Sequence, residues 1–205
     1  AASGLTMVAT ATGLTSGNSA TTLNVVPAAA SVMRFLTLPS TTGSSGAALA
    51  LQPVVVIEDA FGNPVTTAGT GITASIASGP GGATMSGATA TTNALGVATF
   101  TVLAISGSSG AYTLAFDALA LPALSSATIT LGSGTAARIA ISTAPSTTAA
   151  NGAVFATQPV VQLQDGAGNP VAQAGVTVIA ASASGGGTLG GTSTVVTSAT
   201  GAAIF

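Results

Sequence analysis

Very few residues of this chain could take part in chemistry. The 205 residues include two arginines, four acidic residues and no lysine, histidine or cysteine. Nucleophilic and acid–base catalysis therefore lack their usual thiolate, imidazole and amine, and the many serines and threonines have no activating partner. Glu58 and Asp59 are neighbours, and neighbouring strand residues point to opposite faces, so they cannot act as a carboxylate pair. We expect no catalytic residue, no cofactor and no enzymatic activity.

Calcium binding is the one ligand chemistry that the acidic residues offer. Asp59 and Asn63 fall in one turn, and Asp165 and Asn169 fall in another. Their side-chain oxygens are ligands that calcium accepts, but each turn has a single carboxylate, whereas calcium usually takes more charge. A role in the turn itself is favoured, because an aspartate at the first turn position accepts hydrogen bonds from the turn backbone. We therefore expect no metal site.

The element that positions these residues is a repeated stretch of fourteen residues. It reads QPVVVIEDAFGNPV at 52–65 and QPVVQLQDGAGNPV at 158–171, with nine identical positions and a spacing of 158 − 52 = 106. Alternating apolar residues predict a strand. Gly62 stands where a tight turn needs a positive φ, and Pro64 restricts the return of the chain. The stretch predicts a β-hairpin with Ile57 facing the core and Glu58 facing outward.

Further short strands are expected along the whole chain, and no helical periodicity competes with them. In the central part they cover 32–38, 47–59, 72–78, 88–92, 97–105, 112–119 and 127–131, with a loop at 39–46 and a glycine-rich bend at 78–87. About seven short strands separated by turn signals describe an immunoglobulin-like sandwich. The predicted fold is all-β, built of tandem immunoglobulin-like β-sandwich modules.

The repeat divides the chain into three parts. Residues 1–30 are expected to be the closing strands of a preceding module, since 5–13 and 20–26 align with 112–120 and 127–133. Residues 31–133 are expected to form a complete module, and residues 134–205 an incomplete module that lacks its last strands. Ala1 aligns with Ser108, and Phe205 with Phe100.

Each end of the chain therefore supplies what the other lacks. One expectation is a window on a longer continuous array. The other is strand exchange, in which residues 5–26 of one subunit complete residues 138–205 of the next. In both cases the copies join head to tail.

The motifs resemble a known family. VVVIEDAFGNPV and VVQLQDGAGNPV, the bends GGATMSG and GGGTLGG, the pair ALGVATFTV and ATGAAIF, and GAYTLAF from Gly110 occur in one consistent order. In these motifs the chain resembles the bacterial immunoglobulin-like repeat of group 1, found in intimin- and invasin-type surface proteins. The resemblance implies a sandwich fold and an extracellular spacer or adhesive role.

Composition excludes several other classes of protein. The charged fraction is 3%, far below the roughly 25% of ordinary globular domains, and the clustered cations of a nucleic-acid-binding surface are missing. No uninterrupted apolar run of about 18 residues predicts a membrane span. One tyrosine and no tryptophan leave few rings to stack on sugars, which argues against a sugar-binding module. Edge strands without lysine and a net charge of −2 favour self-association.

The few charges are expected to meet where modules join. Arg34 begins a strand and Asp59 ends the next, and Arg138 and Asp165 do the same in the following copy. Consecutive strands run in opposite directions, so each pair lies at one pole, which faces the preceding module. The favoured function is a structural segment of an extracellular bacterial fibre, sheath or surface layer that assembles head to tail. The alternative is the spacer stalk of an adhesin whose binding tip lies elsewhere.

Overall fold

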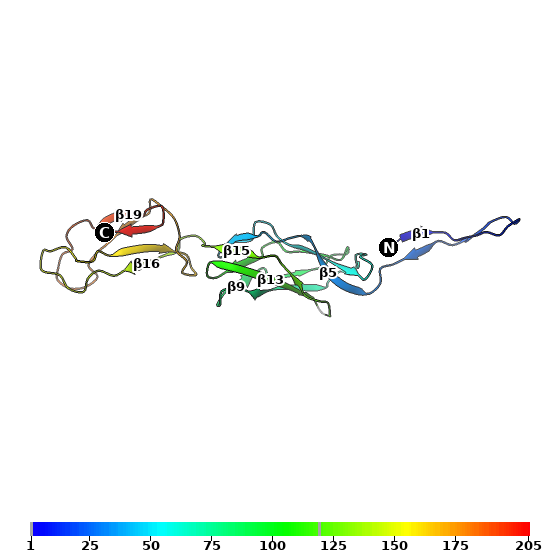
Figure 1. The fold of residues 1–205 in the computed structure, drawn as a ribbon, viewed down its shortest axis with the longest axis horizontal. Helices are drawn as coiled ribbons and strands as arrows, with labels where there is room; N and C mark the ends of the chain where they lie inside the picture. The colour runs from blue at the N-terminus through cyan, green and yellow to red at the C-terminus, as the bar shows by residue number, and fades with distance from the viewer. Residues whose placement is uncertain (1, 119) are drawn as a thin grey trace.

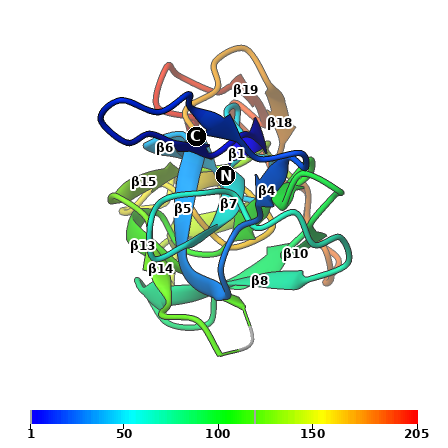
Figure 2. The same ribbon diagram turned by 90° about the vertical axis from the view of Figure 1, so that its right-hand side faces the viewer.

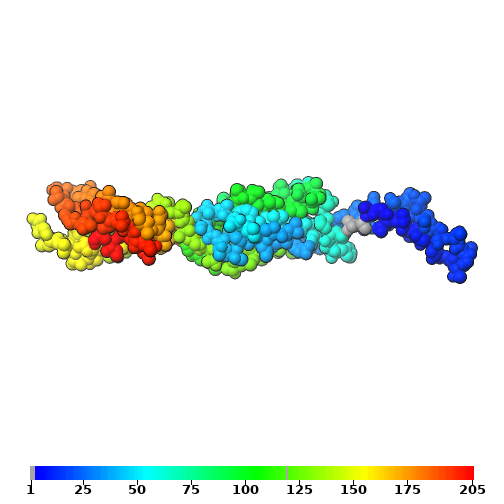
Figure 3. All heavy atoms as spheres, turned by 90° about the horizontal axis from the view of Figure 1, so that it is seen from above, coloured from blue at the N-terminus to red at the C-terminus, as the bar shows by residue number. Residues whose placement is uncertain are grey.

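The computed structural model describes residues 2–118 and 120–205 as strands, turns and loops, without a helix. The molecule is elongated, with three parts in a row along its long axis (Figures 1 and 3). An N-terminal hairpin (residues 2–25) occupies one end, the central sandwich (residues 30–132) follows, and a C-terminal unit (residues 138–204) occupies the other end. The predicted all-β class is confirmed.

The central sandwich consists of two main sheets, seen end on in Figure 2. One sheet has the order β11 (Val97–Thr99), β7 (Val54–Asp59) and β5 (Ala30–Thr37). The other has the order β10 (Thr89–Thr91), β8 (Gly71–Ser78), β13 (Gly110–Ala118), β15 (Ile129–Gly132) and β6 (Thr42–Ser44), with β14 (Leu124–Ser125) on β13. A small pair, β9 (Thr84–Ser86) and β12 (Ala104–Ser106), lies beside them. This is an immunoglobulin-like arrangement.

The core forms where the two sheets face each other. Phe116 on β13 meets Phe35 on β5 and Phe100 after β11 edge to face, with ring centroids 5.1 Å and 5.4 Å apart. Tyr112, fully buried at the start of β13, donates its hydroxyl to the Ser108 carbonyl at 2.7 Å. A buried tyrosine that bonds the backbone just upstream is the corner typical of immunoglobulin-like sandwiches. Burial raises the pKa of the Tyr112 hydroxyl.

Several strand predictions differ from the structure. The strand expected at 97–105 is two strands: β11 pairs with β7, and after a bend β12 pairs with β9. The loop expected at 39–46 contains β6, which runs parallel to β15. Both differences arise because partners far along the chain, rather than local sequence, decide the pairing. The strand expected at 112–119 is observed as β13 to Ala118, and Leu119 lies outside the described residues.

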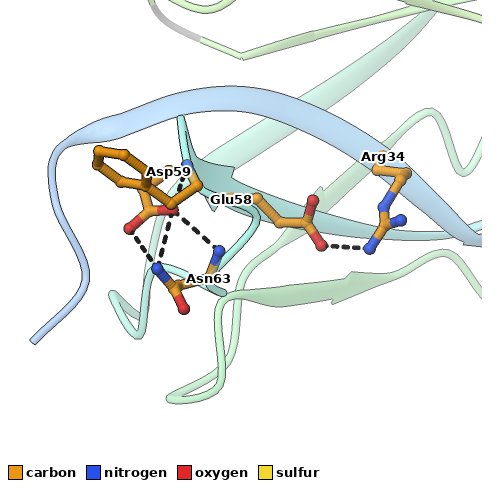
Figure 4. A network of polar contacts seen from close by, with 5 residues as sticks. Arg34, Glu58, Asp59 and Asn63 are labelled. Atoms are coloured by element: carbon orange, nitrogen blue, oxygen red, sulfur yellow. Dashed lines mark hydrogen bonds and ion pairs between the residues drawn. The ribbon is translucent and has the colours of Figure 1, made fainter. Parts of the chain in front are cut away.

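Glu58 lies on the face of β7 that points away from the core, as predicted, but this face is buried rather than exposed. Val56 and Glu58, on the face predicted to be exposed, are buried along with the core-facing residues of β7. β7 is the middle strand of its sheet, so side chains from both neighbouring strands flank this face. Arg34 on β5 reaches across it and pairs with Glu58, with Nη2 2.6 Å from Oε1 (Figure 4).

The N-terminal hairpin consists of β1 (Ala2–Leu5), β2 (Val8–Ala9), β3 (Gly17–Asn18) and β4 (Leu23–Val25). Its pairing repeats that of β13 with β14 at a spacing of 107, since Val8 faces Asn18 as Ala115 faces Ser125. Met7 N donates to Ser19 Oγ at 3.0 Å, as Leu114 N donates to Ser126 Oγ at 2.9 Å. Ala1, aligned with Ser108 in the sequence, lies outside the described residues.

The C-terminal unit consists of a sheet and a separate strand pair. The sheet has the order β16 (Arg138–Thr143), β17 (Val160–Gln164) and β20 (Ala202–Ile204), and the pair is β18 (Thr177–Ile179) with β19 (Thr194–Val196). In strand order, β16, β17 and β20 correspond to β5, β7 and β11 of the central sandwich, and β18 and β19 correspond to β8 and β10. The core is small: buried Val161, Val178 and Ala203 form one cluster, and Leu163 and Val171 are buried as well. No helix long and apolar enough to cross a membrane occurs within 2–118 or 120–205.

Candidate junction between the sandwich units

The turn after β7 is organised by the Asp59 carboxylate (Figure 4). Oδ1 accepts the backbone N–H groups of Phe61 and Asn63, each at 2.9 Å, and Oδ2 accepts Asn63 Nδ2 at 3.0 Å. Gly62 closes the turn with φ +77°, a conformation that costs glycine least. The predicted turn role of Asp59 and Gly62 is confirmed by these bonds.

Asp59 also holds the linker that enters the central sandwich. Oδ2 accepts the backbone N–H of Ala28 at 2.9 Å. The second copy repeats this bond, because Asp165 Oδ2 accepts Gly134 N at 2.7 Å. The spacing is the same for both partners, 165 − 59 = 106 and 134 − 28 = 106. One carboxylate thus ties each turn to the linker that precedes its unit.

Asn169 extends the second turn to the neighbouring unit. Its Nδ2 donates to Asp165 Oδ2 at 2.8 Å and to the Gly107 carbonyl at 2.9 Å, and its Oδ1 accepts Ser109 N at 2.7 Å. Gly107 and Ser109 lie in the loop before β13 of the central sandwich. The Asn169 side chain is buried, so both polar atoms depend on these protein partners. This side chain directly bonds the C-terminal unit to the central sandwich.

The linker between these two units is packed against the same pole. A Cβ added at Gly134 would lie 2.3 Å from the Ser45 carbonyl oxygen, so only glycine allows this approach. Ser45 Oγ in turn bonds Gly107, donating to its carbonyl and accepting its N–H, both at 3.0 Å. Residues 44–47, 133–135 and 165–167 line a groove at this joint. The joint therefore contains the loop before β13, the linker and the Asp165 turn.

Both aspartates are ionised over a wide pH range because of their partners. Burial by itself would raise the pKa of Asp165, but the hydrogen bonds from Asn169, Gly134 and Ala167 outweigh it and hold the pKa below its usual value. The same balance holds for Asp59, where the donors are Asn63, Ala28 and Phe61 and the pKa is again lowered. A charged acceptor strengthens each of these hydrogen bonds.

The two arginines predicted for the junction are not structural equivalents. Arg34 faces Val56 across β5 and β7, whereas Arg138 faces Gln164, whose counterpart in the first copy is Glu58. Arg138 Nε donates to Gln164 Oε1 at 3.2 Å, and its Nη2 lies 2.7 Å from where a Cβ of Gly168 would be. Arg138 therefore lies over the second turn, while Arg34 is bound to Glu58 within the sheet.

The four residues considered for calcium are arranged for turn formation. Each aspartate already accepts hydrogen bonds on both oxygens from backbone and amide N–H groups. A cation would have to displace these donors, and Asn169 uses its own oxygen for Ser109 N. Within residues 2–118 and 120–205, no three or more His, Cys, Asp or Glu side chains come together to hold a metal ion.

The partners of Asn169 were not foreseen from the sequence. The residues around it at the joint are glycines and serines, which have no charged or titratable side chain: Ser45, Gly107, Ser109 and Gly134. Gly107 and Ser109 lie about sixty residues before Asn169. The repeat identified the turn at both positions, but a spacing in one sequence does not show which loop meets it.

Comparison with known proteins gives slight likenesses only. No family model matches the chain, and no curated protein does either. Solved structures to which it is similar include the Escherichia coli adhesin FdeC (22% identity, TM-score 0.47, 80% of this chain and 52% of that one). They also include the D0-D1 domain of intimin (22% identity, TM-score 0.37, 84% of this chain and 83% of that one). A glycosyl hydrolase family 2 member from Bacteroides cellulosilyticus is similar as well (21% identity, TM-score 0.39, 62% of this chain and 17% of that one).

The chain thus spans about half of the FdeC chain and about a sixth of the glycosyl hydrolase chain. Adhesin and intimin domains are the kind of protein that the sequence motifs resemble. TM-scores below 0.5 make these likenesses too slight to support an argument about function.

Proposed function

We propose that this chain is a segment of a tandem array of immunoglobulin-like modules that serves as structural material outside a bacterial cell, in a fibre, sheath or surface layer. In this proposal residues 31–133 are one complete module, residues 1–30 belong to the module before it and residues 134–205 to the module after it. The extracellular location is proposed from the sequence resemblance.

The observation that carries the proposal is the bonded joint at Asn169. A flexible linker would leave neighbouring units free to rotate, and loosely linked domains move relative to each other by default. Here one side chain bonds the preceding unit twice, and Asp165 fixes the linker itself. The first copy repeats the bond from Asp59 to its own linker at Ala28. Repeated over many modules, such joints give a stiff rod of regular pitch.

The recurrence of other hydrogen bonds supports the tandem organisation. Thr92 Oγ1 donates to the Thr67 carbonyl at 2.7 Å, and Thr197 Oγ1 donates to the Gln173 carbonyl at the same distance. Each hydroxyl also accepts a backbone N–H at 3.0 Å, from Thr70 in the first copy and Val176 in the second. The two copies thus share the polar interior of the module as well as the turn. Arg138 is proposed to stiffen the joint by covering the second turn, whereas Arg34 braces β5 against β7 inside the central sandwich.

Electron microscopy of the assembled material tests the proposal. A fibre, sheath or layer requires lateral contacts of at least about 1,000 Å² between copies, and filaments or sheets with a repeat of one module length along the rod are expected. Isolated thin rods without lateral order would favour the stalk of an adhesin. Globular or collapsed particles would overturn both, because neither is compatible with stiff joints.

A further inference from the structure

The two linkers of the chain differ at a position that contacts a neighbouring unit. Ala28 precedes the central sandwich, and Gly134 stands at the same place before the C-terminal unit, since 134 − 28 = 106. Each backbone N–H is bound by the aspartate of the following turn, at 2.9 Å and 2.7 Å. The bond to the aspartate therefore forms with either residue. Gly134 does not have a positive φ, so its own backbone conformation does not require glycine either.

Glycine is required at position 134 because of the neighbouring unit. A Cβ at this position would lie 2.3 Å from the carbonyl oxygen and 3.3 Å from the carbonyl carbon of Ser45 in the central sandwich, whereas ordinary contacts begin at 3.4 Å. The obstacle is main chain, which unlike a flexible side chain cannot rotate away. Relief of this contact needs a shift of about 3.4 − 2.3 = 1.1 Å.

The Ser45 carbonyl is held in place by its own unit. The N–H of the same peptide group, which belongs to Gly46, donates to the Ile105 carbonyl at 2.8 Å. The Ser45 hydroxyl donates to the Gly107 carbonyl and accepts the Gly107 N–H, both at 3.0 Å. The loop therefore cannot retreat from an added methyl group without breaking hydrogen bonds inside the central sandwich.

The other side of the contact is held as well. The Gly134 N–H is bound to Asp165 Oδ2, so the linker is fixed to the turn of the C-terminal unit. An added methyl group therefore pushes the two units apart. A shift of this size lengthens the hydrogen bonds of Asn169 to the central sandwich, now 2.7 Å and 2.9 Å, beyond about 3.2 Å, the upper end of the usual N–H···O range.

We propose that position 134 selects which unit can follow the loop at 44–47. Glycine at this linker position, 165 − 134 = 31 residues before the turn aspartate, admits the C-terminal unit. The central sandwich has Ala28 at the same position, since 59 − 28 = 31. It therefore cannot follow a copy of itself through this joint, and the order of units is encoded in the linkers by steric exclusion. The inference rests on the proposed function, since it treats the joint as the contact that assembles an array.

Hydrogen exchange measured by NMR on the whole chain tests the proposal. The Ser109 N–H reports on the joint, because it donates to Asn169 Oδ1 across the two units at 2.7 Å. The Asn169 N–H reports on the turn, because it donates to Asp165 Oδ1 within the C-terminal unit at 2.9 Å. In Gly134→Ala the Ser109 N–H should exchange about tenfold faster or more, since exchange follows local opening. The Asn169 N–H should exchange as in the parent chain.

The matched controls are two other glycine-to-alanine substitutions near the joint. Gly132→Ala lies in the same segment, but its Cβ would meet nothing closer than the Gly43 carbonyl oxygen at 3.7 Å. Gly166→Ala lies in the Asp165 turn, has open space around the added Cβ, and copies Ala60 of the first turn. All three variants lose the backbone freedom of one glycine, so Gly134→Ala differs by its collision between units. Both controls should leave the Ser109 exchange rate unchanged.

The possible results separate this inference from the proposed function. Unchanged exchange at Ser109 in Gly134→Ala would overturn the inference, and so would equal acceleration in the controls. Faster exchange at Asn169 as well would also overturn it, because glycine would then be needed inside the C-terminal unit rather than at the contact. In each of these cases the array proposal stands if the parent chain protects Ser109. An unprotected Ser109 in the parent chain would remove the joint, and with it both the inference and the proposed function.

Discussion

Truncating Asn169 to alanine should loosen the joint between the central sandwich and the C-terminal unit. The substitution removes both hydrogen bonds that this side chain makes to the preceding unit, at 2.7 Å and 2.9 Å. At about 1 kcal/mol for each bond, the docked arrangement loses about 2 kcal/mol. At about 1.4 kcal/mol for each factor of ten, that loss is roughly a 30-fold shift toward the undocked joint. The hydrogen bond to Asp165 is lost as well, so the turn itself is weakened to a smaller extent.

The assay is a distance distribution between two spin labels, one on each unit. Thr99 on β11 and Ile204 on β20 are exposed and occupy matching strands, and both can be replaced by cysteine in a chain that has none. The parent chain should give one narrow distance peak, and Asn169→Ala a broad distribution. The control is Asn93→Ser, which alters a similar turn, with bonds to Leu95 N and Val97 N, far from the joint.

Two results would refute the reasoning. An unchanged narrow peak in Asn169→Ala would mean that the joint is held by something other than these bonds. A loss of stability of the central sandwich comparable to that of the joint would mean that Asn169 acts on folding rather than on docking. The free energy of unfolding of the central sandwich, measured by chemical denaturation, separates the two outcomes.

The remaining predictions concern pH, calcium, the core and the arginines. Asp59 and Asp165 have a folded-state pKa below the unfolded value of about 3.9. The stability that the two carboxylates contribute is therefore complete above that pH, and it declines as the pH falls through the folded pKa. Melting temperatures should be constant from pH 8 to 5 and should decrease at lower pH. Millimolar calcium or a chelator should leave the melting temperature unchanged, because the carboxylate oxygens already accept hydrogen bonds. Phe116→Ala should lower the free energy of unfolding of the central sandwich by about 3–5 kcal/mol, since the ring is fully buried between two others. Arg138→Ala should broaden the spin-label distances, and Arg34→Ala should leave them narrow, because only Arg138 lies over the turn at the joint.

Each of these four predictions would be contradicted by a specific result. Stability that falls between pH 7 and 5 would place the titrating group outside these two turns. A rise of many degrees with calcium would mean that the turns bind the ion after all. A cost below about 1 kcal/mol for Phe116→Ala would contradict the packing of the two sheets. Equal broadening by both arginine variants would make Arg34 part of the joint.

The sequence by itself determined the features whose interactions are local. The Asp59 turn is closed by hydrogen bonds to residues two and four positions away, and a positive φ at Gly62 follows from its place in the turn. The repeat then predicted the same turn at Asp165, and the alternating pattern predicted strands and the burial of Ile57. The all-β class could be predicted as well, because the sequence shows short strand patterns and turn signals but no helical periodicity.

Only the tertiary structure decided which distant elements meet. The pairing of β6 with β15, the passage of the chain from β11 to β12, and the burial of Glu58 beside Arg34 each depend on a strand that is remote in the sequence. The bonds from Asn169 to Gly107 and Ser109 are of the same kind. A hydrogen-bond partner about sixty residues away is chosen by the packing of whole units, and loop residues such as glycine and serine carry no local pattern that announces it. The residue types at the joint were therefore visible in the sequence, whereas their role in joining two units was not.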